Sequence, residues 1–262
     1  MTVGANKVCL AAAWHPRGEQ DRLRRFYPQL QALYDKLIIA VPPEADAEAL
    51  AMMRSLPELT FLEGGDWRSG RHLVLRAGLD SGADFIHYVD GDRLARWIEL
   101  RPEELRQVIE RIPTVDCLIL GRTEAANASH PQALQTTERI CNIVFSNLIQ
   151  RPFDFSAGSR SFSRAAAEFI LRNSPPQRPM GADSEWAVLV HRGGFSMEMM
   201  LVDGLDWETA DRYLPQAADA ETQRRGAAEY DADPEHWAFR AVVAQEIIEA
   251  GLDAMTRPLK VT

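Results

Sequence analysis

Two acidic residues separated by one glycine, Asp90, Gly91 and Asp92, follow directly after the apolar run Phe85–Val89. The run reads as a buried strand, so the acid pair is expected at its carboxyl end, where open α/β sheets bind their ligands. Carboxylates at this spacing can hold a hard divalent cation, which is completed by water and substrate phosphates. The pattern predicts a metal and diphosphate site, and its alternative is a polar turn, since Gly and Asp are common in turns.

The composition is that of an ordinary globular chain of 262 residues with 46% hydrophobic content, enough for one large α/β domain or one domain with a tail. Its 29 basic and 38 acidic residues give a net charge of −9, and no long basic stripe is present. Nucleic acid and anionic membrane surfaces are therefore not expected as main partners. No apolar run reaches the roughly 18 residues of a membrane span.

The expected compartment is the cytoplasm. Residues 1–7 lack a charged leader followed by an apolar segment, so no export signal is expected. The three cysteines, Cys9, Cys117 and Cys141, lie in apolar surroundings typical of buried thiols rather than of disulfides or a zinc site.

Short apolar runs alternate with helical patterns through most of the chain, which predicts an α/β fold with a mainly parallel sheet and helices on both faces. The strands expected from these runs are Val8–Ala13, Leu37–Val41, Leu59–Leu62, Phe85–Val89 and Asp116–Gly121. A long helix is expected from Pro131 to Gln150, with its buried face formed by Leu134, Ile140, Val144 and Leu148.

The last part of the chain differs in composition, which suggests an α/β domain over residues 1–210 and a helical extension over residues 211–262. Asp233 and Pro234 mark the start of a final helix. Trp237, Ala241, Val242 and Ile248 share one side of it. We expect this side to pack on the body or to form a homo-oligomer interface.

Further motifs follow one another in a fixed order. They are Gly70-Arg71 at a helix start, Ala83 to Asp92 with its closing acid pair, Asp116 to Arg122 ending in Gly-x-Arg, Asp154 to Arg160 with Ser-x-Gly-x-Arg, and Gly181 to Glu185 as Gly-x-Asp-x-Glu. This ordered set resembles the nucleotide-sugar glycosyltransferases of the A-type fold, particularly the family 2-like members. The resemblance runs from about Val8 to Glu208.

The resemblance implies a single A-type glycosyltransferase domain with a helical C-terminal extension. It implies a hexosyltransferase-like activity: metal-dependent transfer of a sugar from a nucleoside diphosphate sugar to a hydroxyl of a small-molecule or glycan acceptor, with inversion favoured. The cofactor would be Mn²⁺ or Mg²⁺, bound at a DxD motif, and a bound divalent ion would stabilise the charge on the departing phosphate.

The same resemblance suggests roles for individual residues near the donor. Asp92 would bind the metal directly, and Asp90 would contact the ribose or the metal through water. Arg71 and Arg160 would bind the donor, since a guanidinium suits phosphate oxygens, with Asp90 and Gly91 beside it. For both arginines the alternative is a surface ion pair.

On the acceptor side, Asp183 stands where the family places the base that takes a proton from the acceptor hydroxyl. Its alternative is a helix cap without chemistry. Family members often add a third metal ligand near the C-terminus, and Glu185, Glu208 and His236 are candidates for that position or for acceptor contact.

Two other functions remain open from the sequence. A nucleotidyltransferase on a related sheet would use the same acids but release pyrophosphate, and a catalytically silent sugar-nucleotide-binding protein would need only the binding groups. The histidines show no zinc-ligand spacing, and the Gly-x-x-x-x-Gly-Lys sequence of a phosphate-binding loop is missing.

Overall fold

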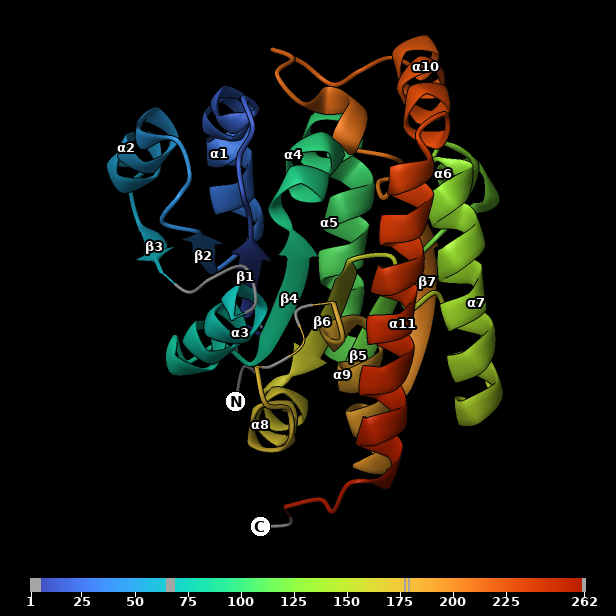
Figure 1. The fold of residues 1–262 in the computed structure, drawn as a ribbon. Helices are drawn as coiled ribbons and strands as arrows, with labels where there is room; N and C mark the ends of the chain where they lie inside the picture. The colour runs from blue at the N-terminus through green and yellow to red at the C-terminus, as the bar shows by residue number, and fades with distance from the viewer. Residues whose placement is uncertain (1–5, 65–68, 177, 179, 261–262) are drawn as a thin grey trace.

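A computed structural model describes residues 6–64, 69–176, 178 and 180–260. Seven strands form one sheet in the spatial order β3-β2-β1-β4-β6-β5-β7, in which β6 runs antiparallel to both neighbours and the other pairs are parallel (Figure 1). The strands are β1 (Val8–Ala13), β2 (Lys36–Val41), β3 (Leu59–Glu63), β4 (Phe85–Asp90), β5 (Cys117–Arg122), β6 (Ser159–Ser163) and β7 (Met197–Val202).

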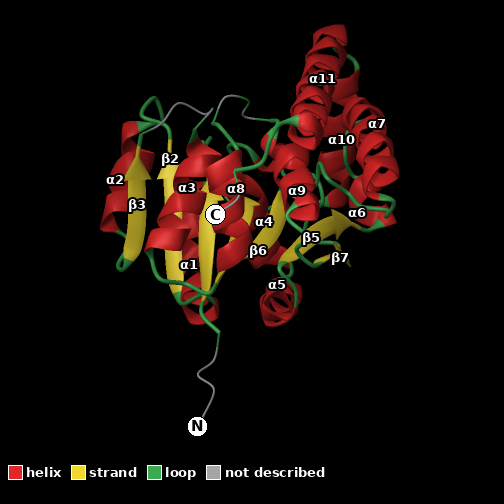
Figure 2. Cartoon of the chain, turned by 90° about the horizontal axis from the view of Figure 1, so that it is seen from below, coloured by secondary structure: helices red, strands yellow, loops and turns green. Residues whose placement is uncertain are grey.

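Helices cover both faces of the sheet, and each face has its own apolar core (Figure 2). One face is covered by α1 (Gln20–Leu33), α2 (Ala47–Ser55), α4 (Gly91–Leu100) and α5 (Pro102–Arg111). The other is covered by α3 (Gly70–Asp80), α7 (Gln132–Ile149), α8 (Arg164–Asn173), α9 (Ala182–Arg192) and α11 (Pro234–Thr256). Two further helices are the short α6 (Glu124–Ala128), which follows β5, and α10 (Ala220–Asp231), which precedes α11. The predicted α/β class with helices on both faces is confirmed.

The two cores follow from the alternation of side chains along each strand. In β1, Cys9 and Ala11 face the core under α3, whereas Val8 and Leu10 face the core under α1. Every residue of the β1 run is apolar because both faces are covered, as parallel sheets require.

Parallel pairing brings the carboxyl ends of β1, β2, β3 and β4 to one edge of the sheet. Because β6 is antiparallel, its first residues lie at this same edge, with Ser159 opposite Val89. The backbone N–H of Asp90 donates to the carbonyl of Gly158 at 3.2 Å. The acid pair and the loop before β6 are therefore neighbours in space, although about seventy residues separate them along the chain.

The buried faces expected for two helices are confirmed only in part. In α7, Leu134 is buried, Val144 and Leu148 are half-buried against the core, and Ile140 is 49% exposed. The other buried residues of α7 are Ala133, Thr137, Glu138, Cys141, Phe145 and Ile149. In α11, Trp237 and Val242 are 36% and 61% exposed, so this side does not pack on the body, and its role as a homo-oligomer interface stays a prediction. The buried residues of α11 are Val243, Ala244, Ile247, Ala250, Gly251 and Ala254. The buried side of α11 is built mostly of small residues, which let it approach α9 and α7 closely (Figure 1).

Cys9, Cys117 and Cys141 are buried free thiols, as their apolar surroundings predicted. Burial raises the pKa of each thiol to about 12, so they stay protonated and unreactive.

Within the described ranges, none of the helices combines the length and apolar character that crossing a bilayer requires. Residues 1–5, which entered the argument about an export leader, lie outside the described part of the chain.

The packing of α11 predicts that alanine at Gly251 destabilises the protein, although alanine favours helices. A Cβ at Gly251 would lie 2.3 Å from two ring atoms of Phe145 and 2.8 Å from Ser184 Oγ. We expect Gly251→Ala to lower the free energy of unfolding by about 1–3 kcal/mol in urea denaturation. Gly70→Ala is the control, because its Cβ would meet only Ala13 at 3.7 Å. Equal stability of the two variants would contradict this packing.

Candidate active site at the carboxyl edge of the sheet

The acid pair sits where β4 ends and α4 begins, with Asp90 last in the strand and Gly91 first in the helix. Glycine is required here because a Cβ at Gly91 would lie 2.4 Å from Trp14 Cβ. Asp90 Oδ1 accepts a hydrogen bond from Tyr88 Oη at 2.5 Å. Asp92 Oδ1 accepts one from the backbone N–H of Arg93 at 2.9 Å. The two carboxylates are thus fixed from opposite sides of one tight turn.

Asp92 lies in a strongly negative environment. Burial, then the charges of Glu208 and Asp90, raise the pKa of Asp92 to about 7. A carboxyl group so perturbed by neighbouring carboxylates is typical of a functional site, because the cluster would be relieved by a bound cation.

Glu208 is brought to the acid pair from the far end of the chain by a clamp on α4. Arg96 binds Asp206 through two hydrogen bonds of 2.8 Å and binds Asp211 at 2.7 Å. Arg22 holds the other oxygen of Asp211 at 2.8 Å. These side chains are buried, so the two acidic residues that flank Glu208 are fixed against the helix that carries Asp92.

Arg93 lies between the carboxylates. Its Nη1 is 3.6 Å from Glu208 Oε2, and its Nε is 3.8 Å from Asp90 Oδ2. Burial by itself lowers the pKa of Arg93, but the charges of Glu208 and Asp90 raise it above its ordinary value. Nη1 of Arg93 and Oε2 of Glu208 are buried atoms for which the described residues supply no hydrogen-bond partner.

These residues suit a hard divalent cation in their chemistry. Among the described residues, no three His, Cys, Asp or Glu side chains converge closely enough to form a complete metal cage. Mg²⁺ sites commonly use one or two protein carboxylates and leave the remaining positions to water and phosphate oxygens. Asp92 and Glu208, whose Oε2 has no hydrogen-bond partner in the described ranges, fit that pattern, with Asp90 beside them.

Arg71 connects the acid pair to Asp183. From the first turn of α3, its Nη1 lies 2.9 Å from Asp183 Oδ1, and its Nη2 lies 3.5 Å from Asp90 Oδ1. The guanidinium also lies over the Tyr88 ring, 5.7 Å from its centre. The structure therefore brings Arg71, Asp90 and Asp183 together, as a shared site would require.

Arg160 is the second guanidinium that binds Asp183. Its Nη2 donates to Asp183 Oδ1 at 2.8 Å, and its other hydrogen bonds go to the backbone carbonyls of Phe155, Ala182 and Asp183. Arg160 is 3% exposed, so a guanidinium expected to bind the donor is instead occupied with the protein. Arg160 thus fixes Oδ1 of Asp183 and the backbone around that residue.

Asp183 lies in the first turn of α9, but its side chain does not cap the helix. Oδ1 accepts from both Arg71 and Arg160, whereas no hydrogen bond from the described residues reaches Oδ2. The carboxylate therefore presents one oriented oxygen that remains available to a hydroxyl group.

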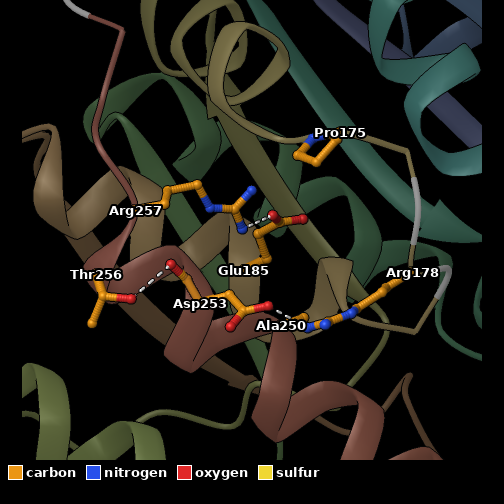
Figure 3. Close-up of a pocket in the computed structure, with 7 residues that line it drawn as sticks. All are labelled: Pro175, Arg178, Glu185, Ala250, Asp253, Thr256 and Arg257. Carbon is orange, nitrogen blue, oxygen red and sulfur yellow. Dashed lines mark hydrogen bonds and ion pairs between the residues drawn. The ribbon is translucent and has the colours of Figure 1, made fainter.

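Glu185 points away from this site. It accepts from Ser174 Oγ at 2.7 Å and forms an ion pair with Arg257 at the end of α11. Figure 3 shows it in a separate cavity of about 300 Å³ between α9 and α11. Burial raises the pKa of Glu185, although Ser174 and Arg257 oppose this. Its hydrogen bonds and ion pair within the described residues do not include Asp92.

His236 also lies elsewhere. Its ring stacks on Tyr230 with 3.9 Å between centres, and its Nδ1 lies 2.9 Å from the Tyr230 carbonyl oxygen. It lines a cleft of about 380 Å³ with Trp207 and Tyr230. Of the three candidates for a third metal ligand, Glu208 is the one that the structure places beside the acid pair.

Sequence reasoning missed Arg93 and Arg96. Arg96 follows Asp92 by four residues, which is the spacing of neighbours on one side of a helix, and this was the available signal. Its pairing with Asp206 and Asp211 joins residues more than a hundred positions apart, for which the sequence holds no local signal.

The raised pKa of Asp92 predicts a pH-dependent stability in the absence of metal. The folded chain keeps this proton up to about pH 7, whereas the unfolded chain releases it near 3.8. The carboxyl group therefore stabilises the folded state less as pH rises from about 4 to about 7. In EDTA we expect Asp92→Asn to raise Tm by about 2–4 °C at about pH 8, with less than half that gain at about pH 5.

The control is Asp80→Asn at an exposed carboxylate. Circular dichroism melts at both pH values measure the effect. A difference between Asp92→Asn and the native protein that does not change with pH would contradict the negative environment of Asp92.

The chain is similar to several solved structures. No protein-family model matches its sequence, and no curated protein sequence matches it. Glucosyl-3-phosphoglycerate synthase from Mycobacterium tuberculosis is similar at a TM-score of 0.59 and 12% identity, over 97% of this chain and 82% of that one. A structure described as a mycobacterial protein is similar at a TM-score of 0.58 and 11% identity, over 97% and 76%.

The same synthase in complex with Mn²⁺, uridine diphosphate and phosphoglyceric acid is similar at a TM-score of 0.54 and 11% identity, over 97% of this chain and 80% of that one. The similarity extends over nearly the whole chain and includes its C-terminal helices. The chain therefore has the A-type fold of the nucleotide-sugar transferases that its motifs resemble.

Proposed function

We propose that this protein transfers a sugar, most simply a hexose, from a nucleoside diphosphate sugar to an acceptor hydroxyl, with a divalent metal ion as cofactor. The observation that carries the proposal is that Arg71 forms two ion pairs, one with Asp90 and one with Asp183. Arg71 thereby joins the acid pair at the end of β4 to the start of α9. A site for diphosphate and a site for proton transfer thus share one edge of the sheet, as glycosyl transfer requires.

Asp92 and Glu208 would hold Mn²⁺ or Mg²⁺, with Asp90 beside them. When bound, the ion acts as a Lewis acid that stabilises the negative charge on the departing diphosphate. The crowding of carboxylates around Asp92 supports this assignment, because it costs free energy that a cation would offset. The crystal structure of the mycobacterial synthase with Mn²⁺ and uridine diphosphate supports it as an analogy of fold.

Arg71 would bind the donor while keeping its contact with Asp90. Its two terminal nitrogens already face two carboxylates, so it can orient them and donate to a phosphate oxygen or the ribose. Gly91 would lie beside the donor, in a turn whose backbone packs directly against Trp14.

Asp183 would act as general base. Arg71 and Arg160 fix Oδ1, and Oδ2 can accept the acceptor's hydroxyl proton as the oxygen forms a bond to the anomeric carbon. The bond between that carbon and the phosphate oxygen breaks, and the nucleoside diphosphate leaves with both bonding electrons. Attack from the side opposite the leaving group inverts the anomeric centre.

The three buried thiols suit a reducing compartment, and we propose that the protein works in the cytoplasm. Its acceptor would be a small molecule or a glycan, because acidic composition disfavours nucleic acid.

Donor binding should stabilise the folded protein in a metal-dependent way. A ligand at a hundred times its Kd adds about 2.7 kcal/mol, which raises Tm by several degrees. We expect one nucleoside diphosphate of a panel to do this with Mn²⁺ and much less in EDTA, as measured by thermal unfolding. Asp92→Asn should lose the Mn²⁺-dependent part, and Asp80→Asn should keep it.

Loss of the base should slow transfer without preventing donor binding. We expect Asp183→Asn to lower kcat by about 10²- to 10⁴-fold and to keep the diphosphate-dependent rise in Tm. The native enzyme should release nucleoside diphosphate and give a product of inverted anomeric configuration by NMR. Release of pyrophosphate would instead identify a nucleotidyltransferase, and binding without turnover would identify a silent binding protein.

A further inference from the structure

Arg93 is a buried cation with unusually poor partners. The residue is 7% exposed, on the first turn of α4. Its contacts with Asp90 and Glu208, at 3.8 and 3.6 Å, are both longer than a hydrogen bond. Its Nη1 is buried and has no hydrogen-bond partner in the described part of the chain.

Such an arrangement costs free energy unless something else completes it. A guanidinium carries five N–H donors in a fixed fork, and burying them without acceptors loses their hydrogen bonds to water. Arg160 also has a buried nitrogen without a partner, its Nε, but Arg96 and Arg160 both reach carboxylate oxygens at 2.7 to 2.8 Å. Among these three arginines, Arg93 alone makes no hydrogen bond to a carboxylate of the described residues.

Gly158 lets the loop before β6 pack directly against Arg93 and Asp90. A Cβ there would lie 2.8 Å from Arg93 Nε and 2.7 Å from Asp90 Oδ2. Gly158 has a φ of +73°, a conformation that also favours glycine, so this residue places only backbone beside the arginine and the acid pair.

The chemistry of Arg93 selects the kind of ligand. Its nearest negative charges are Glu208 and Asp90, at 3.6 and 3.8 Å. Phosphate oxygens match the guanidinium fork in charge and spacing better than neutral or cationic organic groups do. The carboxylates repel an approaching anion, and a divalent cation beside it reduces this repulsion, so a nucleoside diphosphate binds more tightly with a metal than without one.

We propose that Arg93 binds the diphosphate of the donor, exchanging its long contacts to Asp90 and Glu208 for hydrogen bonds to phosphate oxygens. This inference rests on the proposed function, since it assigns a further residue of the same site. In the free protein Arg93 acts as a resident cation among the carboxylates. In the complex it shares the diphosphate charge with the metal, so part of the nucleotide affinity is independent of metal.

Isothermal titration calorimetry with UDP and GDP, in Mn²⁺ and in EDTA, tests the proposal. The native protein should bind one of them in both conditions, more weakly in EDTA. Arg93→Gln should lose at least tenfold in affinity in Mn²⁺ and lose detectable binding in EDTA. Arg93→Lys should lose less, because it keeps the charge without the fork. Arg106→Gln, at an exposed pair on α5, is the matched control.

Titration of Mn²⁺ in the absence of nucleotide distinguishes the loss of a nucleotide contact from a general disruption of the folded site. Arg93→Gln should bind Mn²⁺ as tightly as the native protein or more tightly, because the competing cation is gone. Nucleotide affinity in Arg93→Gln and Arg93→Lys within twofold of native would overturn the proposal, as would parallel loss of Tm and of Mn²⁺ binding. Failure of the native protein to bind Mn²⁺ or any nucleotide would instead reject the proposed function.

Discussion

The concentration of carboxylates at the carboxyl edge of the sheet is the constraint on which the rest of the site depends. Asp90, Asp92 and Glu208 would repel one another without compensation, and their burial makes this repulsion stronger. Arginines from α3 and α4 supply the compensation, but they do so unequally. Asp183 has two guanidinium partners at 2.8 and 2.9 Å, whereas Asp92 accepts only a backbone N–H hydrogen bond from the described residues. The compensation is therefore stronger around Asp183 than around Asp92.

Helix α4 links the chemistry to the stability of the fold. Its first turn carries Asp92 and Arg93, and its second carries Arg96, which holds the segment around Glu208. Gly204 packs so closely on Trp97 that a Cβ would lie 2.0 Å from the indole nitrogen. A change in this packing would move Glu208 relative to Asp92, so the position of a candidate ligand is set by buried contacts outside the reacting groups.

The sequence predicted the parts of this structure that depend on local patterns. Apolar runs between helical segments indicated the strands, and the position of Asp90 after such a run indicated the edge of the sheet. The expected face of α7 was wrong at Ile140, and packing of the Trp237 and Val242 side of α11 on the body was wrong, because large apolar residues were expected to be buried. In α11, Ala250, Gly251 and Ala254 are buried instead, and Val242 is exposed, since close helix contact favours small side chains. Arg96 with Asp206 and Arg93 with Glu208 are long-range pairs that no local period encodes.

The central claim, that this acidic edge holds a divalent metal together with a nucleoside diphosphate, is tested most directly by locating the metal. Crystals grown with Mn²⁺ and the preferred nucleoside diphosphate would show it by anomalous scattering. The account predicts a peak at bonding distance from a carboxylate oxygen of Asp92 and from phosphate oxygens, with Glu208 adjacent. A peak at another site, or nucleotide bound away from the end of β4, would contradict it.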